Sequence, residues 1–228
     1  MKHPVIIGAG GVASYLLPVL IKTFGPKSIT IVDKDVLEKR NLDRQLFKDE
    51  QIGQSKAQAL ADLWIPKDIK VNIVTEWFEF GLPLPEDFDL LVCVADNHKA
   101  RCDALLTADT SKRPCVLGGN EYLDNEAYIY YPRWKGTKRD PRVAHPELLT
   151  TGDEGSPLAC TGLAQIGSPQ LAIANSGCAT KILHLLWVWE RFAKKEKLNP
   201  EALDCLPHEL CSSLTRHDAI SARELASA

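Results

Sequence analysis

A glycine-rich turn between an expected strand and an expected helix constrains this chain more than any other feature. Residues 5–7 are apolar and β-branched, and the run 8–11 that follows holds three glycines. Apolar residues then recur at helical spacing over 12–24, and a β-branched run over 28–32 predicts a second strand. A strand, a helix and a strand in this order form one βαβ unit of a parallel sheet.

The rest of the chain continues to alternate strands and helices. Further strands are expected at 70–74, 89–94 and 115–117, an antiparallel strand at 126–131, and helices at 55–64, 97–108 and 169–194. Pro18 predicts a kink in the first helix. Residues 41–54 are polar and indicate a loop or short helix, and residues 132–160 lack periodicity and predict a long crossover loop.

These elements predict an α/β fold of the Rossmann-like, doubly wound kind. We expect a mostly parallel sheet with an antiparallel extension and a long C-terminal helix. One domain would span residues 1–198, and residues 199–228 would form a tail that could dock a partner.

Composition excludes several function classes. The 228 residues carry a net charge of -3, which argues against a general nucleic-acid or membrane binder. The apolar runs fall short of the roughly 18 residues of a membrane span, and the first residues lack a signal-peptide pattern, so we expect a cytoplasmic protein. The seven cysteines include no C-x-x-C pair, which excludes the usual zinc ribbon. A metal could in principle be gathered by Cys205, His208, Cys211 and His217, but incidental residues of a partly buried tail are favoured.

The glycine turn and one carboxylate indicate a nucleotide. Gly8, Gly10 and Gly11 would let the backbone approach a phosphate at the N-terminus of the following helix. Asp33 ends the second strand, where a carboxylate accepts hydrogen bonds from ribose hydroxyls. A nicotinamide or flavin enzyme explains these features equally well.

Four further blocks separate the alternatives. They are Asp33-Lys34-Asp35-Val36, Asn41-Leu42-Asp43-Arg44-Gln45, Gly53-Gln54-Ser55-Lys56, and Asp96-Asn97 with Arg101 one helical turn later. In order and spacing they resemble the D-x-D-x-V, N-L-x-R-Q, G-x-x-K and D-N-x-x-x-R blocks of the ThiF/MoeB/ubiquitin-activating family. The resemblance covers residues 4–120 well and extends more loosely through the long C-terminal helix.

The resemblance implies ATP and Mg²⁺ as cofactors. Asp33 would hold the ribose, and Asp96 would lie near Mg²⁺. The phosphates would be held by Asn41, Arg44 and Lys56. The other expected nucleotide contacts are Asp35, Gln45 and Asn97. A triphosphate needs such cations, whereas a dehydrogenase does not need them on the loop after the second strand. For Asp35 and Arg101, a structural ion pair is as good an explanation as ligand contact.

The implied reaction is adenylation of the C-terminal carboxylate of a ubiquitin-like or sulfur-carrier protein by residues 1–198. Arg44, Lys56 and Asp96 would act in it, and the acyl group could then pass to Cys160, which ends the long loop as the reactive cysteine of the family often does. An inert loop cysteine is the alternative. Cys93, Cys115 and Cys178 lie in apolar segments and are expected in the core.

Other functions stay open. They are adenylation of a small-molecule or tRNA-linked carboxylate, an NAD-dependent oxidoreductase, and a non-catalytic scaffold. Homodimers are common in the family, and a conjugating enzyme is a further possible partner. By analogy, the chain resembles compact bacterial members, some of which occur in anti-phage defence operons. The helix that carries a trans-acting arginine in many members has no counterpart expected before residue 5, so that cation is expected either from elsewhere, such as a partner chain, or to be absent.

Overall fold

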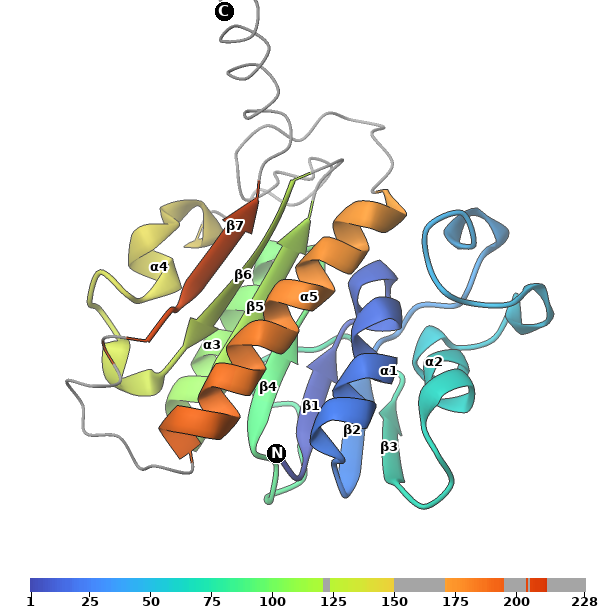
Figure 1. Ribbon diagram of the computed structural model, residues 1–228, viewed down its shortest axis with the longest axis horizontal. Coiled ribbons are helices and arrows are strands. Elements are labelled where there is room, and N and C mark those ends of the chain that lie inside the picture. Colours follow the sequence, from blue (N-terminus) through green and yellow to red (C-terminus); the bar gives the residue numbers. More distant parts are fainter. Residues whose placement is uncertain (121–123, 150–170, 195–203, 205, 213–228) are drawn as a thin grey trace, which may run out of the picture.

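The structure is a seven-stranded sheet with helices on both faces (Figure 1). The computed structural model describes residues 1–120, 124–149, 171–194, 204 and 206–212. The strands are β1 (Pro4–Ile7), β2 (Ser28–Val32), β3 (Lys70–Val74), β4 (Leu90–Cys93), β5 (Cys115–Asn120), β6 (Asn125–Tyr130) and β7 (Glu209–Ser212). Their order is β3-β2-β1-β4-β5-β6-β7; the pairs β5–β6 and β6–β7 are antiparallel, and the other pairs are parallel. The predicted fold class is confirmed.

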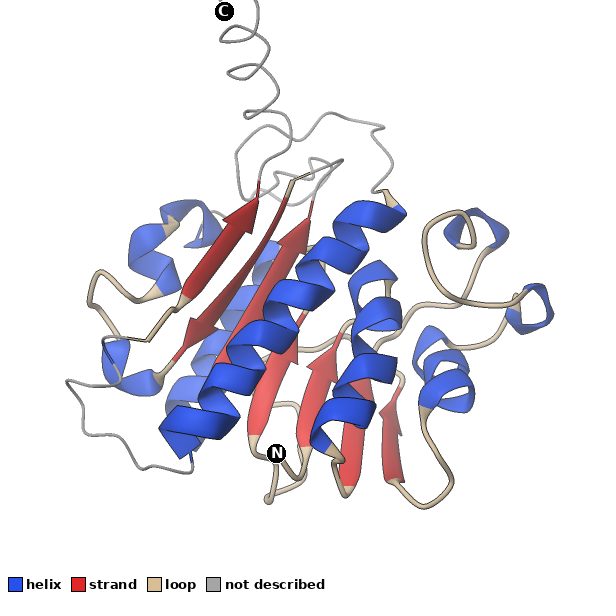
Figure 2. Cartoon of the chain, in the orientation of Figure 1, coloured by secondary structure: helices blue, strands red, loops and turns tan. Residues whose placement is uncertain are grey.

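Helices cover the sheet in two layers (Figure 2). They are α1 (Gly11–Phe24), α2 (Lys56–Trp64), α3 (His98–Ser111), α4 (Pro141–Ala144) and α5 (Ala172–Val188). On one face, α5 packs along α1 and across β5 and β6, while α3 lies on the opposite face. Among the described residues, no helix is both long and apolar enough to cross a lipid bilayer.

The core explains why these segments form strands and helices. β1 and β4 are buried along their whole length, as befits the central strands of a parallel sheet covered on both faces. Gly118 of β5 lets α5 come close, because a Cβ atom there would lie 2.6 Å from Cδ1 of Ile182. Three cysteines predicted to lie in the core are confirmed there, each fully buried: Cys93, Cys115 and Cys178.

Most predicted bounds are confirmed to within a few residues, and α1 runs unbroken across Pro18. The long helix predicted over 169–194 begins at Ala172 and ends in a π-helical segment, Trp189–Lys194, while residues 169 and 170 lie outside the described residues. The polar stretch 41–54 holds one short 3₁₀ helix, Asp49–Gln51, and the end of another, Lys39–Asn41.

Two sequence predictions missed structure. The stretch 132–149 of the supposed loop forms three short helices: η3 (Pro132–Trp134), α4 and η4 (Pro146–Leu149). Residues 150–160 lie outside the described residues. The expected tail contributes β7, which pairs with β6 so that Cys211 lies opposite Glu126. A short, polar edge strand gives no alternating apolar pattern, and its place depends on the partner strand.

A buried polar cluster holds the 132–149 segment on the sheet. Arg142 donates from Nη1 to Oδ2 of Asp109 at 2.9 Å and from Nε to Oδ1 of Asp140 at 2.8 Å. The Tyr130 hydroxyl donates to Oδ1 of Asp109 at 2.5 Å. Asp140 also caps α4 by accepting from the amide of Arg142. Periodicity cannot predict helices that depend on such long-range partners.

We predict that Asp109→Asn lowers the free energy of unfolding at pH 7 by roughly 3 kcal/mol, because it breaks this buried pair. Burial alone would raise the pKa of Asp109, but hydrogen bonds from Tyr130 and Arg142 outweigh burial and lower it. A lowered folded-state pKa means that the stabilisation is present above the unfolded pKa of about 3.9 and is lost as the pH falls through the folded value.

Urea unfolding of wild type and variant at pH 7 and at about pH 3 measures this effect. The gap between the two proteins should shrink at the lower pH. Asp62→Asn is the control, since Asp62 is exposed on α2 and, of the residues that the structure describes, accepts only from Gln58. A gap of equal size at both pH values would contradict the assignment.

Candidate active site at the carboxyl edge of the sheet

The glycine turn brings the ends of three strands together. Gly8 has φ +94°, its amide donates to the carbonyl of Val32 at 2.9 Å, and a Cβ atom there would lie 2.9 Å from the amide nitrogen of Ala95. Gly10 is the N-cap of α1, and the nearest atom to a Cβ built on it is Nε2 of Gln45, at 4.0 Å. The turn therefore leaves space beside a helix N-terminus, which attracts an anion.

Asp33 follows β2 and faces this turn. Its carboxylate accepts from the amide of Ala9 at 2.6 Å and from that of Asp35 at 2.7 Å. Burial raises the pKa of Asp33, and the two backbone hydrogen bonds act against that rise. Asp33 thus lies beside the glycines and holds the turn in place.

Asp35 and Lys56 form the ion pair that the sequence left as one alternative for Asp35. Nζ of Lys56 lies 2.8 Å from Oδ2 of Asp35, and the Lys56 amide donates to the Asp35 carbonyl. The Lys56 side chain is 12% exposed and that of Asp35 is 46% exposed. The pair fixes the ammonium group at the start of α2.

The loop after β2 carries polar atoms that lack partners. Nη1 of Arg44 donates to the Arg40 carbonyl and to Asp43, but its Nε is buried with no partner among the described residues. Gln45 is buried, and its Oε1 also has no partner in the described chain. Buried polar atoms without partners are costly, so these two atoms fit a site that a polar ligand completes.

Asn41 has a different environment from the one expected. Its side chain is buried, and Oδ1 accepts from the amide of Glu38 at 2.9 Å. Part of its hydrogen-bonding capacity therefore shapes the start of the loop.

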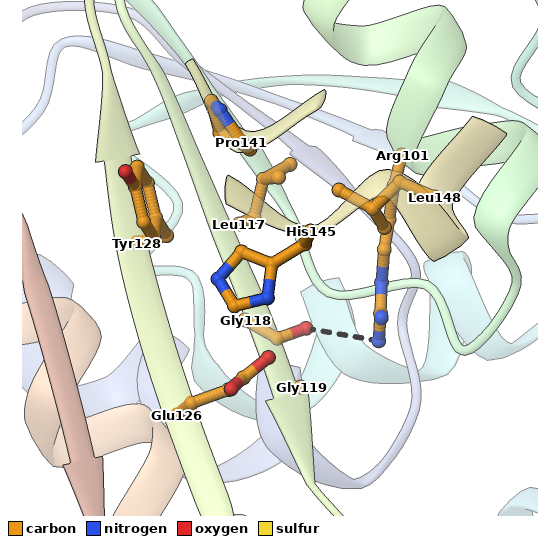
Figure 3. Close-up of a pocket in the computed structure, with 9 residues that line it drawn as sticks. All are labelled: Arg101, Leu117, Gly118, Gly119, Glu126, Tyr128, Pro141, His145 and Leu148. Carbon is orange, nitrogen blue, oxygen red and sulfur yellow. Dashed lines mark hydrogen bonds between the residues drawn. The ribbon is translucent and has the colours of Figure 1, made fainter. Parts of the chain in front are cut away.

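The segment after β4 supplies the remaining predicted residues. Asn97 caps α3 by accepting from the amide of Ala100 at 2.7 Å. Asp96 is exposed, and its carboxylate has no hydrogen bond or ion pair with any described residue, so it is available to a cation. Arg101 is buried and donates to the carbonyls of Ala95 and Gly118, which gives it a structural role (Figure 3).

Comparison with known proteins agrees with this geometry. The model of the ThiF family matches residues 1–208. The chain belongs to the ThiF family. It is 37% identical over 102 residues to SUMO-activating enzyme subunit 2 of Dictyostelium discoideum, covering 42% of this chain and 15% of that protein. It is 27% identical over 227 residues to adenylyltransferase and sulfurtransferase MOCS3 of Aedes aegypti, covering 92% of this chain and 51% of that protein.

The fold of this ThiF-family chain is similar to that of a solved structure. The TM-score is 0.62 with the E. coli tRNA N6-threonylcarbamoyladenosine dehydratase TcdA in complex with AMP, at 17% identity, covering 86% of this chain and 88% of that one. The chain spans at most about half the length of the two curated relatives above.

A pocket that the sequence did not predict lies on the α3 side of β5 and β6 in this ThiF-family chain (Figure 3). The pocket is small and opens to solvent, and the polar residues of its lining are Arg101, Glu126, Tyr128 and His145. His145 lies in the stretch expected to be loop, so only the folded helices α4 and η4 bring it to the sheet.

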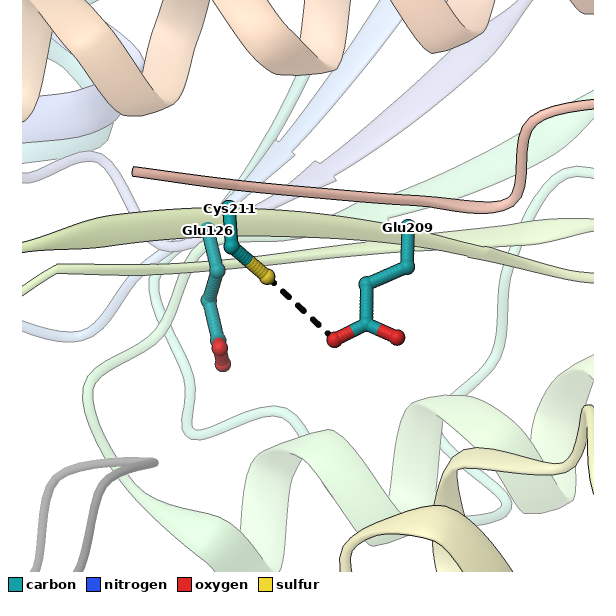
Figure 4. A group of neighbouring side chains, drawn as sticks. All are labelled: Glu126, Glu209 and Cys211. Atoms are coloured by element: carbon teal, nitrogen blue, oxygen red, sulfur yellow. Dashed lines mark hydrogen bonds between the residues drawn. The ribbon is translucent and has the colours of Figure 1, made fainter. Parts of the chain in front are cut away.

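The structure describes His208 and Cys211 of the four tail residues that could in principle gather a metal. Cys211 lies with Glu126 and Glu209, their ligand atoms within 4.8 Å of one another (Figure 4), while Cys205 and His217 lie outside the described residues. Burial and the hydrogen bond to Glu209 raise the pKa of Cys211 to about 12, so at pH 7 it is a thiol. Cys160, the predicted acyl acceptor, lies outside the described residues.

We predict that Gly8→Ala destabilises the ThiF-family fold more than Gly53→Ala does, in urea unfolding. Both glycines have positive φ, +94° and +89°, so alanine is strained at each by about 1–2 kcal/mol. Only at Gly8 does the added Cβ also meet backbone, and nothing lies within 4 Å at Gly53. The expected loss at Gly8 is about 3 kcal/mol or more. Equal losses would show that the strand ends are not in close contact.

Proposed function

We propose that this chain uses ATP with Mg²⁺ to adenylate the C-terminal carboxylate of a small ubiquitin-like or sulfur-carrier protein. The proposal is carried by the glycine turn and, at the same sheet edge, Arg44 Nε and Gln45 Oε1, two buried atoms without a partner among the described residues. A dinucleotide oxidoreductase has no need of these atoms beside the turn. The two curated relatives are named as an activating-enzyme subunit and an adenylyltransferase, which supports the same reaction class.

The residues present fit the nucleotide. The turn at Gly10 offers space and N–H groups for a phosphate. Arg44 would add a bidentate cation, and Lys56, held by Asp35, a point charge. Asp33 would retain acceptor capacity for ribose hydroxyls, since a carboxylate has about four lone-pair sites and two backbone bonds use two of them. Asp96 would supply a hard oxygen ligand for Mg²⁺.

In this reaction the protein would mainly position the reactants and stabilise the charge that develops. A carboxylate oxygen of the partner forms a bond to the α-phosphorus of ATP, and the bond to pyrophosphate breaks, giving an acyl-adenylate. The partner's carboxylate is already ionised at pH 7, so no general base is required. Arg44 and Lys56 would stabilise the negative charge that develops on the phosphate oxygens.

We predict that Arg44→Ala and Asp96→Ala each lower the rate of ATP–pyrophosphate exchange by about 100-fold or more. Arg44→Ala would remove a cation beside the reacting phosphates, and Asp96→Ala would remove a ligand of the Mg²⁺ that neutralises them. The assay contains a small protein that ends in glycine. Arg40→Ala is the matched control. Within the described part of the chain the exposed Arg40 side chain pairs only with Glu38, and the Arg40 carbonyl, which holds Arg44, is unchanged.

Several outcomes would oppose the proposal. Near-normal exchange in either variant would remove that residue from the site. Calorimetry in which Mg-ATP gives no heat while NAD binds would favour an oxidoreductase. If a small carboxylate or a modified tRNA supported exchange and no carrier protein did, the proposed substrate would be wrong.

We further propose that Cys160 accepts the acyl group. Cys160→Ala should leave pyrophosphate exchange unchanged and abolish a thiol-reducible conjugate with the partner on a non-reducing gel, because the thioester needs that sulfur. Cys211→Ala is the control, since the raised pKa of Cys211 makes it a poor nucleophile. A conjugate that survives Cys160→Ala would place the thioester on another cysteine.

A further inference from the structure

Asn175, in the first turn of α5, is fully buried and lies against the candidate site from a distant part of the chain. Its Nδ2 donates to the backbone carbonyl of Arg44 at 3.0 Å, although 131 residues separate the two. Its Oδ1 accepts from Nδ2 of Asn120, at the end of β5, at 2.9 Å. The amide group therefore links α5, the loop after β2 and the end of β5.

The same amide explains why the first residue of α1 is glycine. A Cβ atom built on Gly11 would lie 2.3 Å from Nδ2 and 2.5 Å from Oδ1 of Asn175. By contrast, the space beside Gly10 is open. Gly10 thus leaves room for a ligand, whereas Gly11 leaves room for Asn175.

The hydrogen bond from Asn175 holds the main chain of Arg44, a residue that the proposed reaction uses at the phosphates. The Arg44 guanidinium is held by the Arg40 carbonyl and by Asp43, and its main chain is held by Asn175. Two residues after Arg44, the amide of Leu46 donates a hydrogen bond to Oγ of Ser14 on α1. The loop is therefore hydrogen-bonded to α1 at one point and to α5 at another. These two bonds restrict the position of the Arg44 backbone, from which the side chain extends.

We infer that Asn175 is a positioning residue for adenylation: through its side-chain donor it fixes the Arg44 backbone, and so the guanidinium, beside the glycine turn. The inference rests on the proposed function. In this inference α5 supports the nucleotide site. Asn175 would act by holding Arg44 and would not contact the nucleotide itself.

Asn175→Asp is the sharpest variant because it keeps the shape of the side chain. The carboxylate still accepts from Asn120 but cannot donate to the Arg44 carbonyl, and its charge repels that oxygen. We expect KM for ATP in pyrophosphate exchange to rise about 10- to 100-fold, the scale of one lost buried hydrogen bond or somewhat more. Asn120→Ala is the matched control, since it removes only the other bond of Asn175 and should change KM less than about threefold.

A double-mutant cycle separates positioning from general damage. In an Arg44→Ala background, Asn175→Asp should add little to the defect, because the group that it positions is gone. If the two defects multiply, Asn175 acts by another route and the inference is overturned. Should Asn175→Asp fail to fold, Asn175→Ala takes its place in the cycle.

A second measurement does not depend on activity. Hydrogen exchange of the amides over residues 41–47 should speed up in Asn175→Asp and stay unchanged in Asn120→Ala. Unchanged exchange in both variants would overturn the inference. If wild type shows no ATP-dependent activity while the 41–47 amides respond as expected, the proposed function fails and the link between Asn175 and the loop stands.

Discussion

The close approach of three parallel strand ends at Gly8 is the constraint on which the rest of the structure depends. The amide of Gly8 bonds to the end of β2, and its missing side chain leaves room for the backbone that follows β4. Asp33 completes the arrangement by accepting from the amide of Ala9. Because these contacts fix the start of α1, they also fix where its N-terminal dipole points.

Contacts from distant segments then shape the edge around this turn. The Arg44 loop reaches α1 through Ser14 and reaches α5 through Asn175. On the opposite face of the sheet, Arg101 ties the end of β4 to β5 through two carbonyls. Residues that bind backbone in this way hold the edge rigid, and rigid placement of charge is what stabilises a reacting phosphate.

The antiparallel half of the sheet adds a surface of different character. Residues of β5, β6, α4 and the segment that follows α4 line an open pocket beside Arg101. The buried pair of Asp109 and Arg142 anchors those helices to the core. The half around the glycine turn and this half therefore share α3 and β5 as a common frame.

The sequence by itself determined the succession of strands and helices along the chain from β1 to β6. It also determined the glycine turn and the carboxylate at the end of β2. Each of these depends on local patterns, namely apolar periodicity, glycine before a helix and a residue's place at a strand end. Only the tertiary structure decided that Asp35 pairs with Lys56, that Gly11 makes room for Asn175, that β7 pairs with β6, and that His145 lines the pocket. Such contacts join residues far apart in the chain, and the free energy that selects them comes from burial and hydrogen bonding across the fold, which no local pattern records.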